Sequence, residues 1–387
     1  MAKETLTISL DLRFAHLPGG GRVYVQNLAP VLVSTHPQVR WRLYHNRFCP
    51  HQQQIIQQLR NSLAQQNQPD NLELHPVGSK CLSLKQHLEF LRFHDDADLY
   101  HYLHFDLPLG MRHLPLVVTI HDLYPLTVPN YCSTAKRAYF SRMARSSARR
   151  AAAVIAISQH TKNDIVRLLD VPPQKISVVP QSHSPAYQPI DDHESLDLVR
   201  KKYQLPEKFI FYTGNHKLHK NLARLIKAYA QLATARQKEF PLILTGQIDA
   251  EAQELLTLAE KLQIKKSVTF IGWADQVDLP GLYNLCSLAV SPSYYEGFGF
   301  LPLEAMACGK PVVCSNATAI PEVVGSVARL FDPVSVEQIT AALQEALEND
   351  VDNPQLKQSA LAQAAKFSVQ KTADETFQVY QKVINQT

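Results

Sequence analysis

Short apolar runs alternate along the first half of the chain with longer stretches in which apolar side chains recur at helical spacing. The runs are rich in leucine and β-branched residues, which is typical of buried strands. They occupy residues 6–10, 41–44, 116–120, 154–157 and 176–179. Strands that alternate with helices predict a parallel sheet with helices on its faces, and therefore an α/β domain.

This pattern breaks at residues 180–189, which contain three prolines and lead into a polar stretch. We place a linker between two domains there. A second series of apolar runs follows at residues 209–213, 242–245, 268–271, 288–291, 312–314 and 329–331. We therefore predict an N-terminal domain of residues 1–184 and a C-terminal domain of residues 185–367. A last helix, at about residues 368–387, is expected to pack back on the first domain.

Composition fits two packed domains and narrows the class of protein. The chain has 387 residues, of which 45% are hydrophobic and 19% charged, as in ordinary globular proteins. A net charge of +4 is too small for an obligate nucleic-acid binder, so we expect no nucleic-acid partner. The six cysteines are scattered and are expected to be reduced thiols. Without a signal-peptide core or an apolar run of about 20 residues, the protein is predicted to be cytoplasmic.

Residues 291–311 combine a β-like run, a glycine loop and a helix start, which is a phosphate-binding arrangement. Pro302 suits the first helical position, so the amides of residues 299–301 would be available to an anion. Glu296 and Glu304 flank the loop, where carboxylates could accept hydrogen bonds from sugar or ribose hydroxyls. The alternative is that Glu304 only complements the helix dipole and Glu296 is a loop charge.

A basic segment, residues 212–225, follows the first strand of the second domain. Lys220 precedes a helix that Asn221 would cap. A lysine at such a helix start fits a diphosphate that must be stabilised as it leaves. The alternative is that these basic side chains only solvate a loop.

In the first domain, polar residues gather at predicted strand ends, where open α/β sheets bind ligands. Arg13 leads into the glycines at 19–21, which could form an anion-binding nest. His104 lies in the segment 99–108, and the pair His121 and Asp122 follows the run at 116–120. A lone histidine at such a place is more often a packed or capping residue than a catalytic one.

The string from Glu296 to Glu304 closely resembles the Glu-x7-Glu signature of glycosyltransferase family 4, whose members are retaining nucleotide-sugar enzymes. Further matches extend from residue 6 to about residue 331. The resemblance implies an α/β GT-B fold, in which two Rossmann-like domains face each other across a cleft. It also implies a nucleotide diphospho-sugar donor on the second domain and a glycan or lipid-linked acceptor on the first. No Asp-x-Asp motif stands out, so we expect neither a metal nor another cofactor.

The resemblance also implies roles for individual residues. Catalytic roles fall on His121, Lys220 and Glu296. The implied donor-binding residues are Gly20, Gly21, Asn215, His219, Gly297, Phe298, Gly299, Phe300, Leu301 and Glu304. The implied acceptor-binding residues are Arg13, His104 and Asp122. The arginine that the family pairs with its lysine is missing, and Asn215, His216, Lys217 or His219 stands where it would be.

The string His-Asp-Leu-x-Pro at residues 121–125 resembles family members that transfer mannose or rhamnose in surface-polysaccharide assembly. We therefore predict a retaining, metal-independent hexosyltransferase that transfers mannose or rhamnose. Two alternatives stay open. One is a nucleotide-sugar epimerase with the same fold, and the other is a catalytically degenerate family member that acts as a binding subunit.

Six basic residues without an intervening acid lie between Lys136 and Arg150. Arg142, Arg145 and Arg149 share one helical face. Such a face could rest on anionic lipid at the inner surface of a membrane, where many relatives meet lipid-linked acceptors. The alternative is an ordinary solvated helix.

Overall fold

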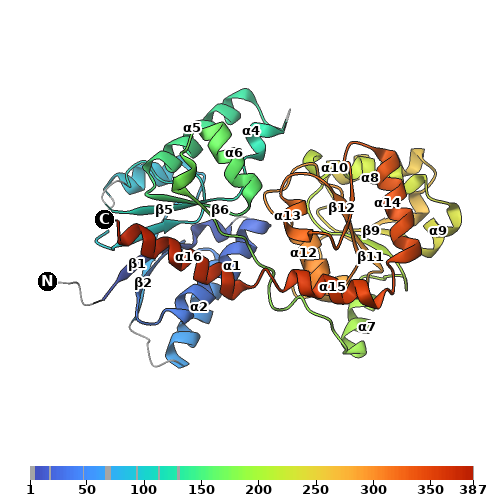
Figure 1. Ribbon diagram of the computed structural model, residues 1–387, viewed down its shortest axis with the longest axis horizontal. Helices are drawn as coiled ribbons and strands as arrows, with labels where there is room; N and C mark the ends of the chain where they lie inside the picture. Colours follow the sequence, from blue (N-terminus) through green and yellow to red (C-terminus); the bar gives the residue numbers. More distant parts are fainter. Residues whose placement is uncertain are drawn as a thin grey trace. The chain divides into compact units, whose positions relative to one another are not determined.

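The computed structural model of the chain describes residues 5–16, 19–46, 48–65, 71–92, 95–111, 114–128 and 131–386. The chain divides into two compact units. Unit 1 comprises residues 1–184 together with 368–387, and unit 2 comprises residues 185–367. Each unit is built around its own sheet (Figure 1).

Unit 1 contains a seven-stranded sheet with the order β3-β2-β1-β4-β5-β6-β7. All of its strand pairs are parallel. The strands are β1 (Thr7–Asp11), β2 (Arg40–His45), β3 (Leu72–Pro76), β4 (Leu99–Tyr102), β5 (Leu116–Ile120), β6 (Ala153–Ala156) and β7 (Ile176–Val178). β1, β4, β5 and β6 are buried along their whole length, as expected of central strands covered on both faces.

The helices of unit 1 connect these parallel strands, except α16, which follows unit 2 in the chain. They are η1 (Leu12–His16), α1 (Gly20–Thr35), α2 (Pro50–Gln65), α3 (Leu84–Glu89), η3 (Phe90–Arg92), α4 (Tyr124–Thr127), α5 (Thr134–Arg150), α6 (Gln159–Leu169), η4 (Pro173–Lys175) and α16 (Val369–Ile384). Two strands, β3 and β4, lie outside the apolar runs of the sequence. β3 is a half-buried edge strand, and β4 carries tyrosines and a histidine among its buried residues.

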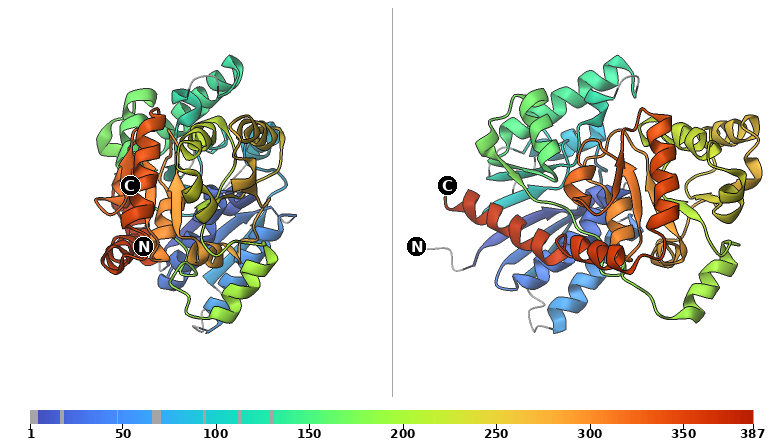
Figure 2. Two further views of the ribbon diagram at one scale, coloured as in Figure 1. Left: turned by 90° about the vertical axis from the view of Figure 1, so that its right-hand side faces the viewer. Right: turned by 45° about the vertical axis from the view of Figure 1, so that its right-hand side comes forward.

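The C-terminal helix α16 belongs to unit 1, although unit 2 precedes it in the chain. It packs along α1 (Figure 1 and Figure 2). The Tyr380 hydroxyl lies 2.5 Å from the Nδ1 of the buried His101, and the Phe377 ring stacks on His36. Since Ala373, Phe377 and Tyr380 are buried in the same core as β1 and β4, α16 is an integral layer of unit 1.

Unit 2 contains a six-stranded parallel sheet with the order β10-β9-β8-β11-β12-β13. Its strands are β8 (Ile210–Tyr212), β9 (Leu242–Leu244), β10 (Val268–Phe270), β11 (Leu288–Ser291), β12 (Val312–Ser315) and β13 (Arg329–Phe331). Its helices are α7 (His193–Lys202), η5 (Leu218–Lys220), α8 (Leu222–Ala230), α9 (Thr234–Glu239), α10 (Ala250–Lys261), η6 (Lys265–Ser267), α11 (Leu279–Leu285), α12 (Phe300–Ala307), α13 (Ile320–Val324), α14 (Val336–Asn349) and α15 (Pro354–Ala364). Two Rossmann-like domains, as predicted, make up the chain.

Candidate functional site

An ion pair lies at the carboxyl ends of two neighbouring strands of unit 2. β8 and β11 are adjacent and parallel, so the segments that follow them meet at one edge of the sheet. Lys220 ends η5 after β8, and Glu296 lies in the loop after β11. The Lys220 Nζ lies 2.7 Å from the Glu296 Oε1, and the two side chains are 18% and 21% exposed. Two of the three residues predicted to be catalytic are therefore in direct contact.

The charge of Lys220 sets the ionisation of Glu296. Burial acts to raise the pKa of Glu296, but the ammonium of Lys220 and hydrogen bonds from Lys220 and Ser293 outweigh it and lower the pKa. Glu296 is therefore a carboxylate at neutral pH. Its backbone amide donates to the Thr318 hydroxyl at 2.9 Å, which fixes the loop after β11.

Asn221 occupies the N-cap position of α8 but does not cap the helix with its side chain, and this part of the prediction is wrong. Its Nδ2 donates instead to the carbonyls of Pro292 and Pro333, at 2.9 and 2.7 Å. Its φ of 61° places it in the left-handed region, which asparagine tolerates better than most residues. Asn221 therefore ties the loop of Lys220 to the loop that leads to Glu296.

The glycine loop ends at Gly299, whose φ of 138° favours glycine. Helix α12 begins at Phe300, two residues before the predicted start at Pro302. The amides of Phe300 and Leu301 lie in its first turn, where amides have no acceptor within the helix. Phe298 is buried, and its ring contacts the rings of Phe300 and Phe367.

Glu304 lies in α12 with only 6% of its surface exposed. The Tyr283 hydroxyl of α11 donates to its Oε2 at 2.9 Å. Burial raises the pKa of Glu304 to about 7, against the opposing effect of hydrogen bonds from Tyr283 and Tyr187. The two glutamates of the motif therefore differ: Glu296 is ionised at neutral pH, whereas Glu304 is partly protonated.

The candidates for the missing arginine lie in the segment between β8 and Lys220. The His216 ring is buried, with Nε2 2.9 Å from the carbonyl oxygen of Thr245. His219 is buried next to the ion pair, and burial together with Lys220 lowers its pKa to about 4. It is therefore neutral at pH 7 and does not supply a second positive charge. The carbonyl of Asn215 accepts a hydrogen bond from the Tyr212 hydroxyl, and the Lys217 side chain is exposed.

In unit 1, the ring of His121 is hydrogen-bonded through both of its nitrogens. Nε2 lies 2.9 Å from the carbonyl oxygen of Leu103, and Nδ1 lies 2.8 Å from the Gln181 Nε2. Because a carbonyl only accepts, Nε2 carries the hydrogen and Nδ1 accepts from the amide. Burial, and next the neighbouring His104, lower the pKa of His121 to about 3. Asp122 is half-buried beside it, and its Oδ1 accepts from the Tyr124 amide at 3.3 Å.

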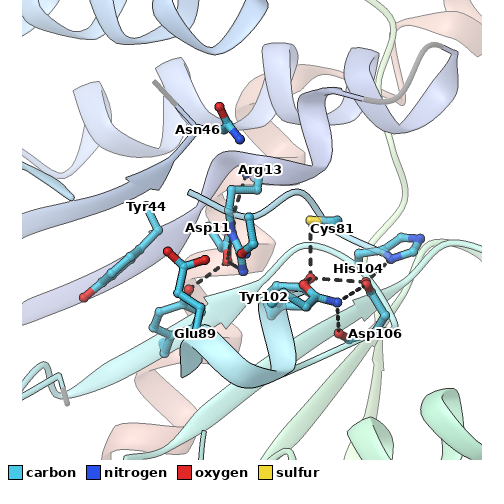
Figure 3. A network of polar contacts seen from close by, with 12 residues as sticks. Asp11, Arg13, Tyr44, Asn46, Cys81, Glu89, Tyr102, His104 and Asp106 are labelled. Carbon is cyan, nitrogen blue, oxygen red and sulfur yellow. Dashed lines mark hydrogen bonds and ion pairs between the residues drawn. The ribbon is translucent and has the colours of Figure 1, made fainter. Parts of the chain in front are cut away.

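His104 lies after β4 in a buried polar network (Figure 3). Its Nδ1 is hydrogen-bonded to Oδ1 of the fully buried Asp106. The Gln86 Nε2 and the Leu82 amide donate to the Asp106 Oδ2, each at 2.6 Å. Burial opposes ionisation of Asp106, but His104 and these hydrogen bonds hold its pKa well below the ordinary value. Its carboxylate therefore anchors both the ring of His104 and the segment before α3.

Arg13 was expected to bind an acceptor, but the structure places it inside unit 1, where its side chain is 0% exposed. Its Nη2 lies 2.6 Å from the Asp11 Oδ2, and its Nη1 donates to the Ser79 hydroxyl at 3.1 Å. The guanidinium also lies over the Phe90 ring, and Figure 3 shows the Arg13 and Asp11 side chains next to each other. Arg13 therefore joins β1 to the segment before α3, and its acceptor-binding role stays a prediction.

The predicted glycine loop of unit 1 forms the start of α1. Gly20 and Gly21 are its first two residues, preceded by Gly19 with a φ of 94°. A Cβ atom on Gly21 would lie 2.3 Å from the Phe14 ring, and that ring stacks on His104 at 4.2 Å. The absence of a side chain at Gly21 is therefore required by packing.

The basic segment forms α5, and several of its arginines are used within unit 1. The Arg150 guanidinium donates to the carbonyls of Leu107, Pro108 and Met111. Arg145 donates to the Leu168 carbonyl, and Arg149 pairs with Asp170. Lys136 and Arg142 are exposed.

Several contacts of the site could not be read from the sequence. Tyr187 and Tyr283 hold Glu304 from outside the motif, Gln181 holds His121, and Asp106 holds His104. Asp106 had a usable signal, since it lies two residues after His104 at a strand end.

Across the described ranges, no group of three or more His, Cys, Asp or Glu residues is placed to hold a metal ion. Nor does any helix in that part of the chain have the length and apolar character needed to cross a bilayer.

Comparison with known proteins agrees with this architecture. The profile described as Glycosyltransferase Family 4 matches residues 18–182, and the profile described as Glycosyl transferases group 1 matches residues 197–366. The chain resembles sucrose-phosphate synthase from Thermosynechococcus elongatus with a TM-score of 0.77 and 19% identity, over 99% of this chain and 100% of that one. At this identity the likeness concerns the fold alone.

Two relatives from Escherichia coli are more similar in sequence. O-antigen chain mannosyltransferase B is 33% identical over 283 residues, which cover 73% of this chain and 74% of the relative. Serotype-specific mannosyltransferase WbdA is 35% identical over 267 residues, 66% of this chain but only 32% of that longer protein. The predicted family and fold are confirmed: the chain is a GT-B enzyme that belongs to glycosyltransferase family 4.

Proposed function

We propose that this glycosyltransferase transfers a hexose, mannose or rhamnose, from a nucleotide diphospho-sugar to a glycan or lipid-linked acceptor in surface-polysaccharide assembly, with retention of configuration and without a metal. The observation that carries the proposal is the ion pair of Lys220 and Glu296 at the start of α12. The names of the relatives, both mannosyltransferases, favour mannose.

Unit 2 is proposed to hold the donor. Lys220 and the amides of the first turn of α12 carry the positive charge and partial charge that a diphosphate needs. Glu304 accepts hydrogen bonds from the ribose hydroxyls, and Glu296 from the donor sugar. When the diphosphate binds, Lys220 exchanges part of its contact with Glu296 for a phosphate oxygen, so its charge is available to the leaving group.

The reaction is proposed to take place on one face of the sugar. The bond between the anomeric carbon and the phosphate oxygen breaks, and the acceptor hydroxyl oxygen forms the new bond on the same face. The departing phosphate oxygen takes the proton of that hydroxyl, so no residue of the protein serves as a nucleophile. Neutralisation by Lys220 and the α12 amides replaces the role that a divalent cation has in other transferases.

A lipid-linked acceptor would be met at a membrane surface. Lys136 and Arg142 of α5 are exposed. His87 of α3 contacts Tyr139 of α5, and α3 with the following η3 exposes Leu84, Leu88 and Leu91, at 76%, 70% and 63%. Exposed leucines at helical spacing beside cations suit a surface of anionic lipid. We propose this face as the peripheral contact. Flotation with phosphatidylglycerol vesicles should then be lost in Leu84→Glu/Leu88→Glu, and equal flotation of this variant would contradict the contact.

The donor assignment is tested by a thermal-shift screen with GDP, UDP, dTDP and ADP and their sugar conjugates, without metal. A ligand that binds only the folded protein raises the melting temperature. We expect one nucleotide to stabilise the wild type and the Lys227→Ala control on the exposed side of α8, but not Lys220→Ala. Equal stabilisation of Lys220→Ala would refute the role of Lys220. Turnover of donor alone would favour an epimerase, and binding without transfer would favour a binding subunit.

A further inference from the structure

We propose that His104 and Asp106 form a hydroxyl-recognition pair in unit 1, in which Asp106 positions the ring of His104 and His104 Nε2 accepts a hydrogen bond from a non-reacting hydroxyl of the acceptor. This inference rests on the proposed function, because it takes unit 1 as the acceptor-binding unit. It adds a positioning residue, Asp106, and fixes the direction of the hydrogen bond that the acceptor must supply.

Three histidines on the adjacent strands β4 and β5 or just after them differ in whether a ring nitrogen remains available to a ligand. His101 contacts the Tyr380 and Thr119 hydroxyls through its two nitrogens. His121 contacts the Leu103 carbonyl and Gln181. For His104, the only hydrogen bond found among the described residues is the one between Nδ1 and Asp106. Its ring keeps a small exposed area, and Figure 3 shows the second nitrogen pointing away from the polar network.

The environment of Asp106 determines which nitrogen of His104 carries a hydrogen. The Asp106 carboxylate receives hydrogen bonds from the Gln86 side chain, the Leu82 amide and the Tyr102 hydroxyl. An ionised carboxylate only accepts, so the His104 Nδ1 must donate to it. In the neutral ring Nε2 then presents a lone pair. Such an atom selects a hydrogen-bond donor, which a sugar hydroxyl is and an ionised carboxylate or phosphate oxygen is not.

The position of the ring is fixed by packing as well as by Asp106. The Phe14 ring stacks on one side at 4.2 Å, and Phe105 lies at 4.2 Å in a tilted arrangement. His121 lies 6.5 Å away, between ring centres. The ring is thus held rigidly before a ligand arrives, which reduces the entropy lost on binding.

The tautomer is tested first, in the wild-type protein, by 15N NMR of the histidine rings, with the His104 signal assigned from its loss in His104→Gln. We expect hydrogen on Nδ1 and a lone pair on Nε2. Hydrogen on Nε2, whether in the neutral ring or in an imidazolium, would overturn the proposal whatever the enzyme's activity. Asp106→Asn should shift the ring toward the other tautomer, because an amide nitrogen can donate to Nδ1.

The acceptor role is tested by steady-state kinetics with methyl α-mannoside and its monodeoxy analogues as acceptors. We expect His104→Phe, which keeps the stacking on Phe14, to raise the KM for methyl α-mannoside about tenfold, since it removes one hydrogen bond. His104→Gln, whose amide oxygen lies near the position of Nε2, should restore part of this loss. His75→Phe, at the end of β3, is the control and should behave as the wild type.

The donor affinity, measured with the nucleotide found in the thermal screen, should change less than about twofold in His104→Phe. One deoxy analogue should be equally poor for the wild type and His104→Phe, which identifies the hydroxyl that is bound. If His104→Phe still transfers the sugar with an unchanged KM for the acceptor, the recognition pair is refuted. Absence of transfer in the wild type would instead refute the proposed function, so the two failures are distinguishable.

Discussion

Replacing Glu304 with glutamine should make unit 2 more stable at alkaline pH and at the same time weaken donor binding. The pKa of Glu304 is raised to about 7 by burial, whereas in the unfolded chain the carboxyl titrates near its ordinary value of about 4.3. Between these values the folded state binds more protons than the unfolded state, so stability falls as pH rises from about 4.5 to 7. At about 1.4 kcal/mol per pKa unit, the ionised form costs about 4 kcal/mol above pH 7.

Glu304→Gln removes this cost, because the amide is uncharged at every pH and can still accept from the Tyr283 hydroxyl. Calorimetric unfolding at pH 8 should show unit 2 melting about 8–16 °C higher than in the wild type, given a unit of its size, and the difference should vanish near pH 4.5. The same variant should bind the nucleotide about tenfold or more weakly, because the amide replaces one oxygen of Glu304 with an NH2 group that cannot accept a hydrogen bond from a ribose hydroxyl. A gain that is equal at both pH values, or a loss of stability at pH 8, would refute the reasoning.

Three further substitutions test the structure of unit 1. Arg13→Met should lower the free energy of unfolding of the unit by about 3–5 kcal/mol, because it leaves the buried Asp11 carboxylate without its partner. Adding Asp11→Asn to the same chain should restore most of this loss in chemical denaturation. If the effects of the two substitutions simply add, the buried pair is excluded. Tyr380→Ala should cost about 3–5 kcal/mol by leaving a cavity under α16, and an unchanged denaturation midpoint would show that the helix is dispensable. Gly21→Ala should lower the free energy of unfolding by about 1–3 kcal/mol, because the new methyl group displaces the Phe14 ring. Adding Phe14→Leu should recover part of this loss, and a loss that is not recovered would contradict the steric cause.

The arrangement of strands was predictable from the sequence because parallel strands buried on both faces are continuous apolar runs. β5 and β6 carry this signal along their whole length. β3 does not, because an edge strand is half-buried and its residues, Leu-Glu-Leu-His-Pro, are mixed in polarity. The start of α12 was misplaced because proline is tolerated throughout the first turn of a helix, so Pro302 does not mark its first residue.

Only the parts of the candidate site that lie within a short sequence motif could be predicted. Lys220 and Glu296 could each be placed at a strand end, and the adjacency of β8 and β11 brings them together across 76 positions of sequence. The burial of Arg13 could not be predicted, because the sequence around an arginine that follows a strand does not distinguish a contact with a ligand from a contact with a buried aspartate. Asp11, two residues before it, is the partner that decides the matter.

Glu296 and Glu304 differ in ionisation at neutral pH, and in the proposed donor site this suits the two carboxyl groups of one motif to different tasks. Glu296 is ionised because Lys220 is beside it, so the pair has no net charge before the proposed diphosphate binds. Glu304 is surrounded by tyrosine hydroxyls and retains its proton to about pH 7, so it adds little negative charge near an incoming nucleotide. An ionised Glu304 would repel the diphosphate through a medium of low dielectric constant. In the proposed donor site, burial of Glu304 therefore reconciles a carboxyl group that recognises hydroxyls with a ligand that is itself an anion.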